Sequence, residues 1–133
     1  MTTSCPSPHF VQSAIGPAPS GAYSPAVIVD GWCHVSGMGP WDPRTRSVVG
    51  TTIEVQTAQV VANLQSVLAS ARATLAQVIS ASVFLADLER DWSGFDATWS
   101  SFFEPDRYPA RTTVGARLKG VLVEISVLAR IPT

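Results

Sequence analysis

Residues 109–129 read PARTTVGARLKGVLVEISVLA, and they hold two strand patterns in succession. In the first pattern, Arg111, Thr113 and Gly115 stand at every second position, so these three residues share one face of a strand. The second pattern is apolar on both faces apart from Glu124 and one serine, which is typical of a strand buried on both sides. The stretch therefore predicts two strands, one with an arginine and one with a carboxylate.

The arginine and the carboxylate are the first candidates for chemistry. A guanidinium keeps its charge and presents a planar fork, so an arginine near the interior of a sheet needs a carboxylate as its partner. Two interpretations stay open at this point. Either Arg111 and Glu124 pair with each other or with other charges of the protein, or Arg111 binds the carboxylate of a ligand.

Length and composition indicate one domain that forms an oligomer. The chain has 133 residues, of which 46% are hydrophobic and 14% are charged. So low a charge content leaves much weakly polar surface or hides surface between subunits, and we expect an oligomer. The net charge is −1 and the basic residues are scattered, which argues against a patch for nucleic acid or for an anionic membrane.

The sequence shows no pattern of a membrane span, a secretory leader or a metal site. Residues 1–10 lack a basic start and an apolar core, and no apolar run is long enough to cross a bilayer. We therefore expect a cytoplasmic protein. Cys5 and Cys33 are far apart and have no partners at metal-ligand spacing, so neither a disulfide framework nor a metal is expected.

The chain divides into an arm and a domain. Residues 1–20 are rich in proline, serine and glycine, which predicts an extended N-terminal arm, and residues 21–133 predict a single domain.

A hairpin follows near the start of that domain. Residues 26–36 read AVIVDGWCHVS, and Asp-Gly between two β-rich runs is a strong signal for a two-residue turn. On the second strand, Ser36 shares a face with His34. Gly37 and Gly39 at the end of this strand allow another group to approach the backbone closely.

The first helix is predicted after a short strand, which we expect at residues 47–49. Thr51 as N-cap and Glu54 three residues later fit a capping box. Apolar residues then recur at helical spacing, so we predict a helix over residues 52–73 that covers a sheet. Its opposite face carries four polar side chains, those of Gln56, Gln59, Asn63 and Gln65.

The second helix is predicted from an aromatic stripe. It follows residues 78–85, a β-rich run of strand length, and it ends before Pro105. We interpret the stripe as core packing rather than as a platform for a cofactor, because helices pack on sheets through such stripes. The aromatic residues are Trp92, Phe95, Trp99, Phe102 and Phe103.

Taken together, these elements predict an α+β protein with two helices on one face of a mixed six-stranded sheet. The other face has no element left to cover it. A strand that is apolar on both sides would then need a neighbouring subunit.

Several motifs in this order resemble the Rid family of reactive intermediate deaminases, also called YjgF-like or L-PSP-like proteins. The motifs are GAYSPA (21–26), VSG (35–37), Gln56-Thr57 with Asn63-Leu64, VFLADL (83–88), PAR (109–111) and VEI (123–125). The resemblance implies a chorismate-mutase-like fold and a homotrimer whose sheets form a central barrel, with clefts between subunits. It also implies hydrolysis of 2-aminoacrylate and 2-iminopropanoate to a keto acid and ammonia, without metal or organic cofactor.

The resemblance also assigns roles to individual residues. It implies that Arg111 grips the substrate carboxylate, that Glu124 positions or activates water, and that Tyr23 lines the cleft. It places the Ser36-Gly37 turn where backbone donors reach the substrate. The alternative for Tyr23 is a hydroxyl that only ties down the N-terminal arm.

The chain departs from the family pattern at several positions. Thr113 stands where many members have cysteine, and Met38 stands where glutamine is frequent. A common asparagine of the cleft falls on Glu89 or Arg90, next to a one-residue insertion. Together with the bulky Trp41, these changes predict a substrate pocket of altered shape.

Three alternatives therefore remain for the function. The first is general imine and enamine deamination, and the second is the same chemistry on one larger pathway intermediate. The third is a trimeric protein that binds small ligands without catalysis. The ribonuclease activity sometimes attached to the family finds no support, because His9 and His34 lie in unrelated contexts and no basic track is present.

Overall fold

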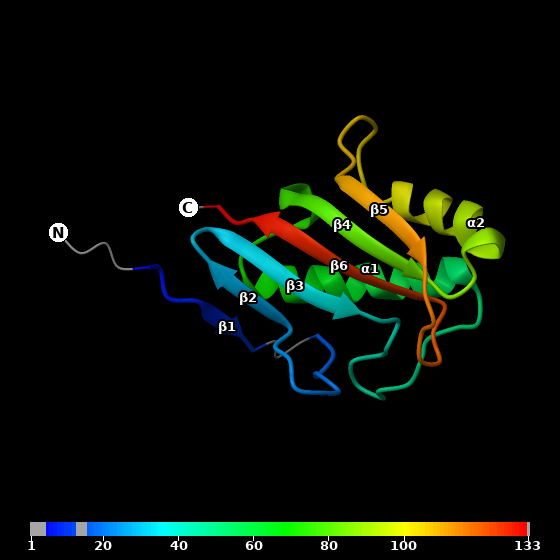
Figure 1. Cartoon of the computed structure of the whole chain (residues 1–133), viewed down its shortest axis with the longest axis horizontal. Coiled ribbons are helices and arrows are strands. Elements are labelled where there is room, and N and C mark those ends of the chain that lie inside the picture. Colours follow the sequence, from blue (N-terminus) through cyan, green and yellow to red (C-terminus); the bar gives the residue numbers. More distant parts are fainter. Residues whose placement is uncertain (1–4, 13–15, 133) are drawn as a thin grey trace.

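The protein is a mixed six-stranded sheet with two helices on one side (Figure 1). The computed structural model describes residues 5–12 and 16–132. Strand order across the sheet is β1-β2-β3-β6-β4-β5, with β4 and β5 parallel and the other neighbours antiparallel. The elements are β1 (His9–Val11), β2 (Ala26–Val29), β3 (Trp32–Met38), α1 (Ile53–Ser70), a 3₁₀ turn (Leu75–Gln77), β4 (Val78–Leu85), α2 (Leu88–Ser100), β5 (Ala110–Gly115) and β6 (Val123–Arg130).

The hairpin of β2 and β3 confirms the turn predicted from the sequence. Asp30 and Gly31 have φ angles of 51° and 78°, and a type I′ turn requires positive φ at both of its central positions. The pairing of Val29 with Trp32 across this turn fixes the register of the two strands.

The sixth strand is not the one expected from the sequence. Residues 47–49 form no strand, and Val48 makes only an isolated bridge to Trp41. Instead, β1 in the N-terminal arm pairs with β2, and Val11 is buried there. The physical reason is that β2 offers an open backbone edge, and the segment that lies beside this edge is residues 9–11 and not residues 47–49. The rest of the predicted arm includes residues 1–4 and 13–15, which lie outside the described residues.

Helix α1 starts one residue later than predicted and uses its polar residues differently. Thr52 is the N-cap, because its side chain accepts a hydrogen bond from the N–H of Val55, so Thr51 and Glu54 form no capping box. Gln56 and Asn63, expected on an exposed face, are buried. Their side-chain amides donate hydrogen bonds to backbone carbonyls of neighbouring loops, so these buried polar groups have the hydrogen-bond partners that they need.

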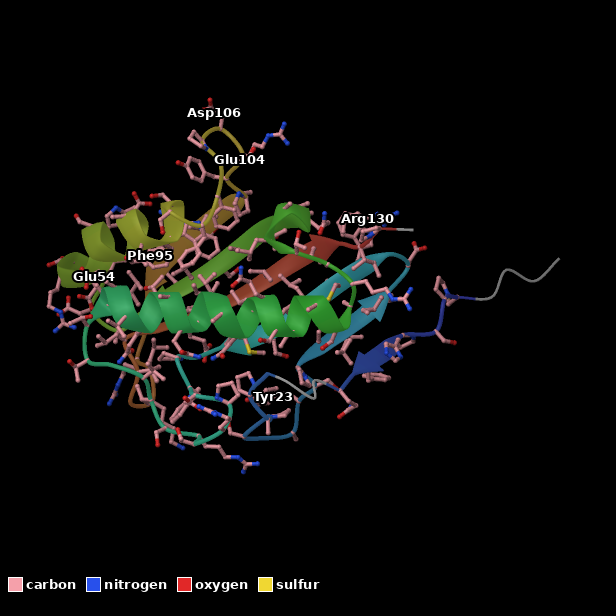
Figure 2. All side chains as sticks on the ribbon, turned by 180° about the vertical axis from the view of Figure 1, so that it is seen from behind. Tyr23, Glu54, Phe95, Glu104, Asp106 and Arg130 are labelled. Carbon is pink, nitrogen blue, oxygen red and sulfur yellow. The ribbon has the colours of Figure 1, made fainter. Side chains whose placement is uncertain are left out.

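The core lies between the sheet and the two helices (Figure 2). Phe95 and Trp99 of α2 are fully buried in it, as expected for the aromatic stripe, whereas Trp92 is 44% exposed. The helix ends at Ser100, so the last two aromatic residues of the stripe lie in the turn that follows it.

In the described part of the single chain, the second face of the sheet is open. Along β6, Val123, Ile125 and Val127 are buried beneath the helices, and the residues between them, which include Glu124, are only half-buried on the other face. Neither helix packs on that face (Figure 1). One chain therefore buries only one side of the strand that the sequence predicted to be buried on both.

Candidate active site

Arg111 lies on the helix-covered face of the edge strand β5. Its Nη1 donates a hydrogen bond to Asp96 Oδ1 of α2 at 2.8 Å, and its side chain is 19% exposed. The guanidinium carbon lies 5.6 Å and 5.2 Å from the ring centroids of Trp92 and Phe95. A cation so placed on aromatic faces is stabilised by their quadrupoles and is held in one orientation. Arg111 therefore pairs with Asp96 and not with Glu124.

A cavity of about 480 Å³ opens beside this ion pair. Asp96 and Arg111 form its charged wall, and Trp99, Ser100, Tyr108 and Pro109 form the remainder. Arg111 thus stands at a space large enough for a small ligand.

Glu124 lies on the open face of the sheet, in the middle of β6. Its carboxylate is packed over the backbone of Gly37 on the neighbouring strand β3, where an added Cβ would lie 2.8 Å from Glu124 Oε2. Gly39 makes a similar approach possible, because a Cβ there would lie 2.7 Å from Nε1 of Trp41. The two glycines therefore make room for a carboxylate and an indole, as the close approach predicted from the sequence requires.

A second cavity, of about 590 Å³, surrounds this carboxylate. Four residues predicted for the site line it together, namely Tyr23, Gly37, Met38 and Glu124, and Trp41 lines it as well. Arg111 does not, since the described residues that line the two cavities do not overlap. The structure thus divides the predicted site into two halves. In Figure 2, Tyr23 of the Glu124 half lies below α1, whereas Phe95, whose ring contacts Arg111, lies above it.

Tyr23 holds the N-terminal arm and also stands on the wall of this cavity. Its hydroxyl oxygen accepts a hydrogen bond from the backbone N–H of Ser20 at 3.1 Å, which ties the N-terminal arm to this cavity. The side chain nevertheless remains 46% exposed on the cavity wall. A ligand in the cavity can therefore contact the phenol without displacing it.

Ser36 holds the same arm from the sheet side. Its hydroxyl donates to the carbonyl of Ser24, and its backbone N–H donates to the carbonyl of Pro25 at 2.9 Å. Both donors of Ser36 are thus used within the chain. In contrast, Thr113 Oγ1, on the same strand face as Arg111, is buried without a hydrogen-bond partner among the described residues.

Sequence reasoning missed Asp96 as the partner of Arg111, and it placed a common asparagine of the cleft at Glu89 or Arg90. Glu89 is exposed, and Arg90 forms ion pairs with Asp91 at 2.9 Å and with Asp87 at 3.7 Å, so neither expected residue contacts Arg111. One feature of the sequence could have pointed to Asp96. It stands four residues after Trp92, so the two side chains lie on one face of a helix.

Two buried amides of α1 hold the loops around the second cavity. Asn63 Nδ2 donates to the carbonyls of Gly39 and Trp41, each at 2.9 Å. Gln56 accepts the N–H of Leu122 at 2.8 Å, just before β6. The sequence placed both residues on a solvent face, so their role in fixing the site was not foreseen.

Hydrogen bonds to the Asp42 carboxylate stabilise the loop that contains Trp41. The pKa of the Asp42 carboxyl is lowered, chiefly because it accepts the backbone N–H groups of Thr45 and Arg44. Burial raises the pKa of the Cys33 thiol.

Within the described ranges, no group of three or more His, Cys, Asp or Glu is placed to hold a metal ion, and no helix has the length and apolarity to span a membrane.

Comparison with known proteins identifies the family. A mixed six-stranded sheet with two helices on one face defines the chorismate-mutase-like class of α+β folds. Within that class, the chain belongs to the Rid (YjgF/L-PSP, RutC) family, because the family profile described as Endoribonuclease L-PSP matches residues 13–131.

Individual relatives cover nearly the whole chain. A RutC family protein of Synechocystis is 38% identical over 127 residues, 93% of this chain and 97% of that protein. A 2-iminobutanoate/2-iminopropanoate deaminase of Capra hircus is 32% identical over 123 residues, 91% and 88% of the two chains. The crystal structure of RidA from the Antarctic bacterium Psychrobacter superposes with a TM-score of 0.86 at 30% identity, covering 92% of this chain and 99% of that one.

Proposed function

We propose that this chain is a cytoplasmic deaminase of reactive imines and enamines such as 2-aminoacrylate and 2-iminopropanoate. Arg111 binds the substrate carboxylate through the nitrogens that Asp96 leaves free, which fixes the position of the imine carbon. Glu124 takes a proton from water as the water oxygen attacks that carbon and gives it to the imine nitrogen, and it then moves the hydroxyl proton of the carbinolamine to the departing nitrogen. Imine and water thereby give a 2-keto acid and ammonia.

The other predicted residues belong to the two halves of the site, one around Glu124 and one around Arg111. Tyr23, Met38 and the backbone of Gly37 complete the side of Glu124, and the Ser36 donors hold that wall in place. Thr113 lies two residues from Arg111 on the same strand face, and its buried hydroxyl lines neither cavity in the single chain.

The two sides come, in this proposal, from different copies of the chain. Arg111 and Glu124 lie on opposite faces of the sheet and in separate cavities, so one small substrate does not reach both within a single chain. We propose that the open sheet faces pack together in a homotrimer with a central barrel and a cleft at each interface. Native mass spectrometry is expected to show the trimer, and a monomer with full activity would contradict it.

The observation that carries the proposal is the environment of Arg111. A guanidinium that is 19% exposed, oriented by two aromatic rings and open to a cavity is suited to grip an anionic group of a ligand. The names of the deaminases from Capra hircus and Bos taurus, each 32% identical to this chain, point to imines as the ligands.

The direct test is a trapping assay. An amino-acid oxidase generates 2-iminopropanoate in situ, semicarbazide traps the imine, and added protein should lower the rate of semicarbazone formation. Arg111→Ala should abolish this effect, because the substrate carboxylate loses its anchor. A correctly folded wild-type protein that leaves semicarbazone formation unchanged would contradict the proposal.

Trp41 and Met38 favour a second candidate, in which the same chemistry acts on one larger imine or enamine. Both residues line the 590 Å³ cavity, so the departures noted in the sequence change the walls of the pocket itself. The trapping assay with imines of bulkier amino acids tests this candidate. Equal or faster turnover of 2-aminoacrylate would count against it.

A protein that binds ligands without catalysis makes a different prediction. Arg111→Ala would then abolish binding of small keto acids, while Glu124→Ala would change no rate because no rate exists.

Ribonuclease chemistry, suggested by the description of the family profile, receives no support from the histidines. By strand register, His9 and His34 point to opposite faces of the sheet.

A further inference from the structure

The ion pair of Arg111 with Asp96 leaves a donor and an acceptor side by side. Asp96 Oδ1 takes only Nη1 of the guanidinium, at 2.8 Å. Among the described residues, no hydrogen bond is made by Nε or Nη2 of Arg111, or by Oδ2 of Asp96. The Asp96 side chain is 51% exposed, and both residues line the 480 Å³ cavity. A ligand in the cavity therefore meets guanidinium N–H groups next to a free carboxylate oxygen.

Such a pair can bind a carboxylate, but at an electrostatic cost. A ligand carboxylate on Arg111 would approach Asp96, and like charges placed close together repel each other. The guanidinium charge is also shared with Asp96 before any ligand arrives. A primary carboxamide matches the pair better, because its C=O can accept from Arg111 and its N–H can donate to Asp96.

We infer that Asp96 determines specificity and shifts this pocket from carboxylates toward neutral carboxamides. The inference rests on the proposed function, in which Arg111 anchors the substrate, and it concerns only the group that is anchored. The substrate class it points to is an imine or enamine with an adjacent amide, N–C=O, in place of the free acid. Deamination of 2-imino acids would continue at this site with weaker binding.

The test compares two ligands of nearly equal shape. Pyruvate and pyruvamide differ in a carboxylate and a carboxamide, and their dissociation constants can be measured by isothermal titration calorimetry with the wild-type protein. Asp96→Asn keeps the shape of the side chain and removes its charge. Glu104→Gln is the matched control, because Glu104 is an exposed acid that pairs with Arg107 and does not line the cavity.

The readout is the ratio of the two dissociation constants. We expect the wild-type protein to bind pyruvamide more tightly than pyruvate. Asp96→Asn should change the ratio by about tenfold in favour of pyruvate, since repulsion is removed and an amide N–H is offered to the carboxylate. Glu104→Gln should leave the ratio unchanged. A role of Asp96 in orienting Arg111 alone would alter both constants together and leave the ratio as it was.

The outcomes separate this inference from the proposed function. If pyruvate binds more tightly than pyruvamide and Asp96→Asn does not alter the ratio, the inference is wrong, while loss of binding in Arg111→Ala would still support Arg111 as the anchor. If neither ligand binds to the folded wild-type oligomer, the inference is also wrong. Failure of the proposed function is detected separately, by the absence of imine turnover in the trapping assay.

Discussion

At the level of single residues, the two charged groups of the site are held by different means. Arg111 is fixed by an ion pair with Asp96 and by two aromatic rings. Among the described residues, Glu124 has no charge partner, and its position is set by close packing over Gly37. A group positioned by packing responds to changes of volume, whereas a group positioned by an ion pair responds to changes of charge.

The packing of Glu124 gives a prediction for Gly37→Ala. The new methyl group would lie 2.8 Å from Glu124 Oε2, so the carboxylate has to move away from its place in the cavity. We expect deaminase activity to fall by about 100-fold, a typical effect of displacing a reacting group. Because only the flexible end of the side chain must move, the free energy of unfolding should fall by about 1 kcal/mol or less.

Gly21→Ala is the control for that variant. A Cβ at Gly21 would lie at an ordinary contact distance of 3.5 Å from the Tyr23 ring. Activity should therefore stay close to that of the wild-type protein. Equal losses of activity in both variants, measured by the trapping assay, would show that the position of Glu124 is not what matters.

Asn63→Ala tests the buried amide that holds the loop of Trp41. The substitution leaves the carbonyl of Gly39 without a donor and that of Trp41 with only the longer bond of 3.4 Å from Gln59 Nε2, so we expect a loss of about 2–3 kcal/mol in the free energy of unfolding. Gln65→Ala on the exposed side of the same helix should change it by about 0.5 kcal/mol or less. Urea denaturation measures both, and a similar cost for the two variants would contradict the assigned role.

Single residues also mark the limit of what the sequence could predict. Strand alternation placed Arg111 and Thr113 on one face, and the register of β5 with β4 confirms it. The partner of Arg111 was out of reach, because Asp96 is 15 positions away on a helix whose rotation depends on tertiary packing. Gln56 and Asn63 were misplaced for a related reason, since a helical pattern does not show which loops lie above its polar face.

At the level of elements, α1 is the part of the fold that carries both the core and the site. One face of the helix packs on the sheet through Val60, Leu64 and Val67, all fully buried. Its buried amides hold the loops that line the cavity of Glu124. Loss of order at the start of this helix would therefore affect stability and the site together.

The cap of α1 can be tested directly. Thr52→Ala removes the oxygen that accepts the N–H of Val55, and the expected cost is about 1 kcal/mol of the free energy of unfolding. Thr51→Ala is the natural control, because Thr51 is exposed and is not the cap, and its cost should be about 0.5 kcal/mol or less. Thermal unfolding compares the two variants, and a larger effect at Thr51 would restore the capping box predicted from the sequence.

Elements with a strong local signal were predictable, and elements that depend on distant pairing were not. The Asp30-Gly31 turn demands positive φ angles that favour few residues, so the hairpin could be located from the sequence alone. The segments at 9–11 and 47–49 are both short and apolar in part, and only the free edge of β2 decides which becomes a strand. Strand order across the sheet likewise depends on contacts far apart in the chain.

At the level of the whole molecule, the open sheet face and the divided site have one common explanation. The sequence predicted an uncovered face from the number of helices and strands, and the single chain shows that face without a helix (Figure 1). It did not predict that Arg111 and Glu124 would lie on opposite faces, because that depends on the register of β5 and β6 around β4. Packing of several copies would cover the face and, in the proposed trimer, complete the site.

The measurement that tests this account most directly is complementation between two inactive variants. Arg111→Ala and Glu124→Ala are each expected to lack deaminase activity. When they are coexpressed in equal amounts, some clefts receive Arg111 from one variant and Glu124 from the other, and about one-quarter of wild-type activity should return in a cyclic oligomer. If native mass spectrometry shows mixed oligomers and the mixture is no more active than either variant alone, the shared site is wrong.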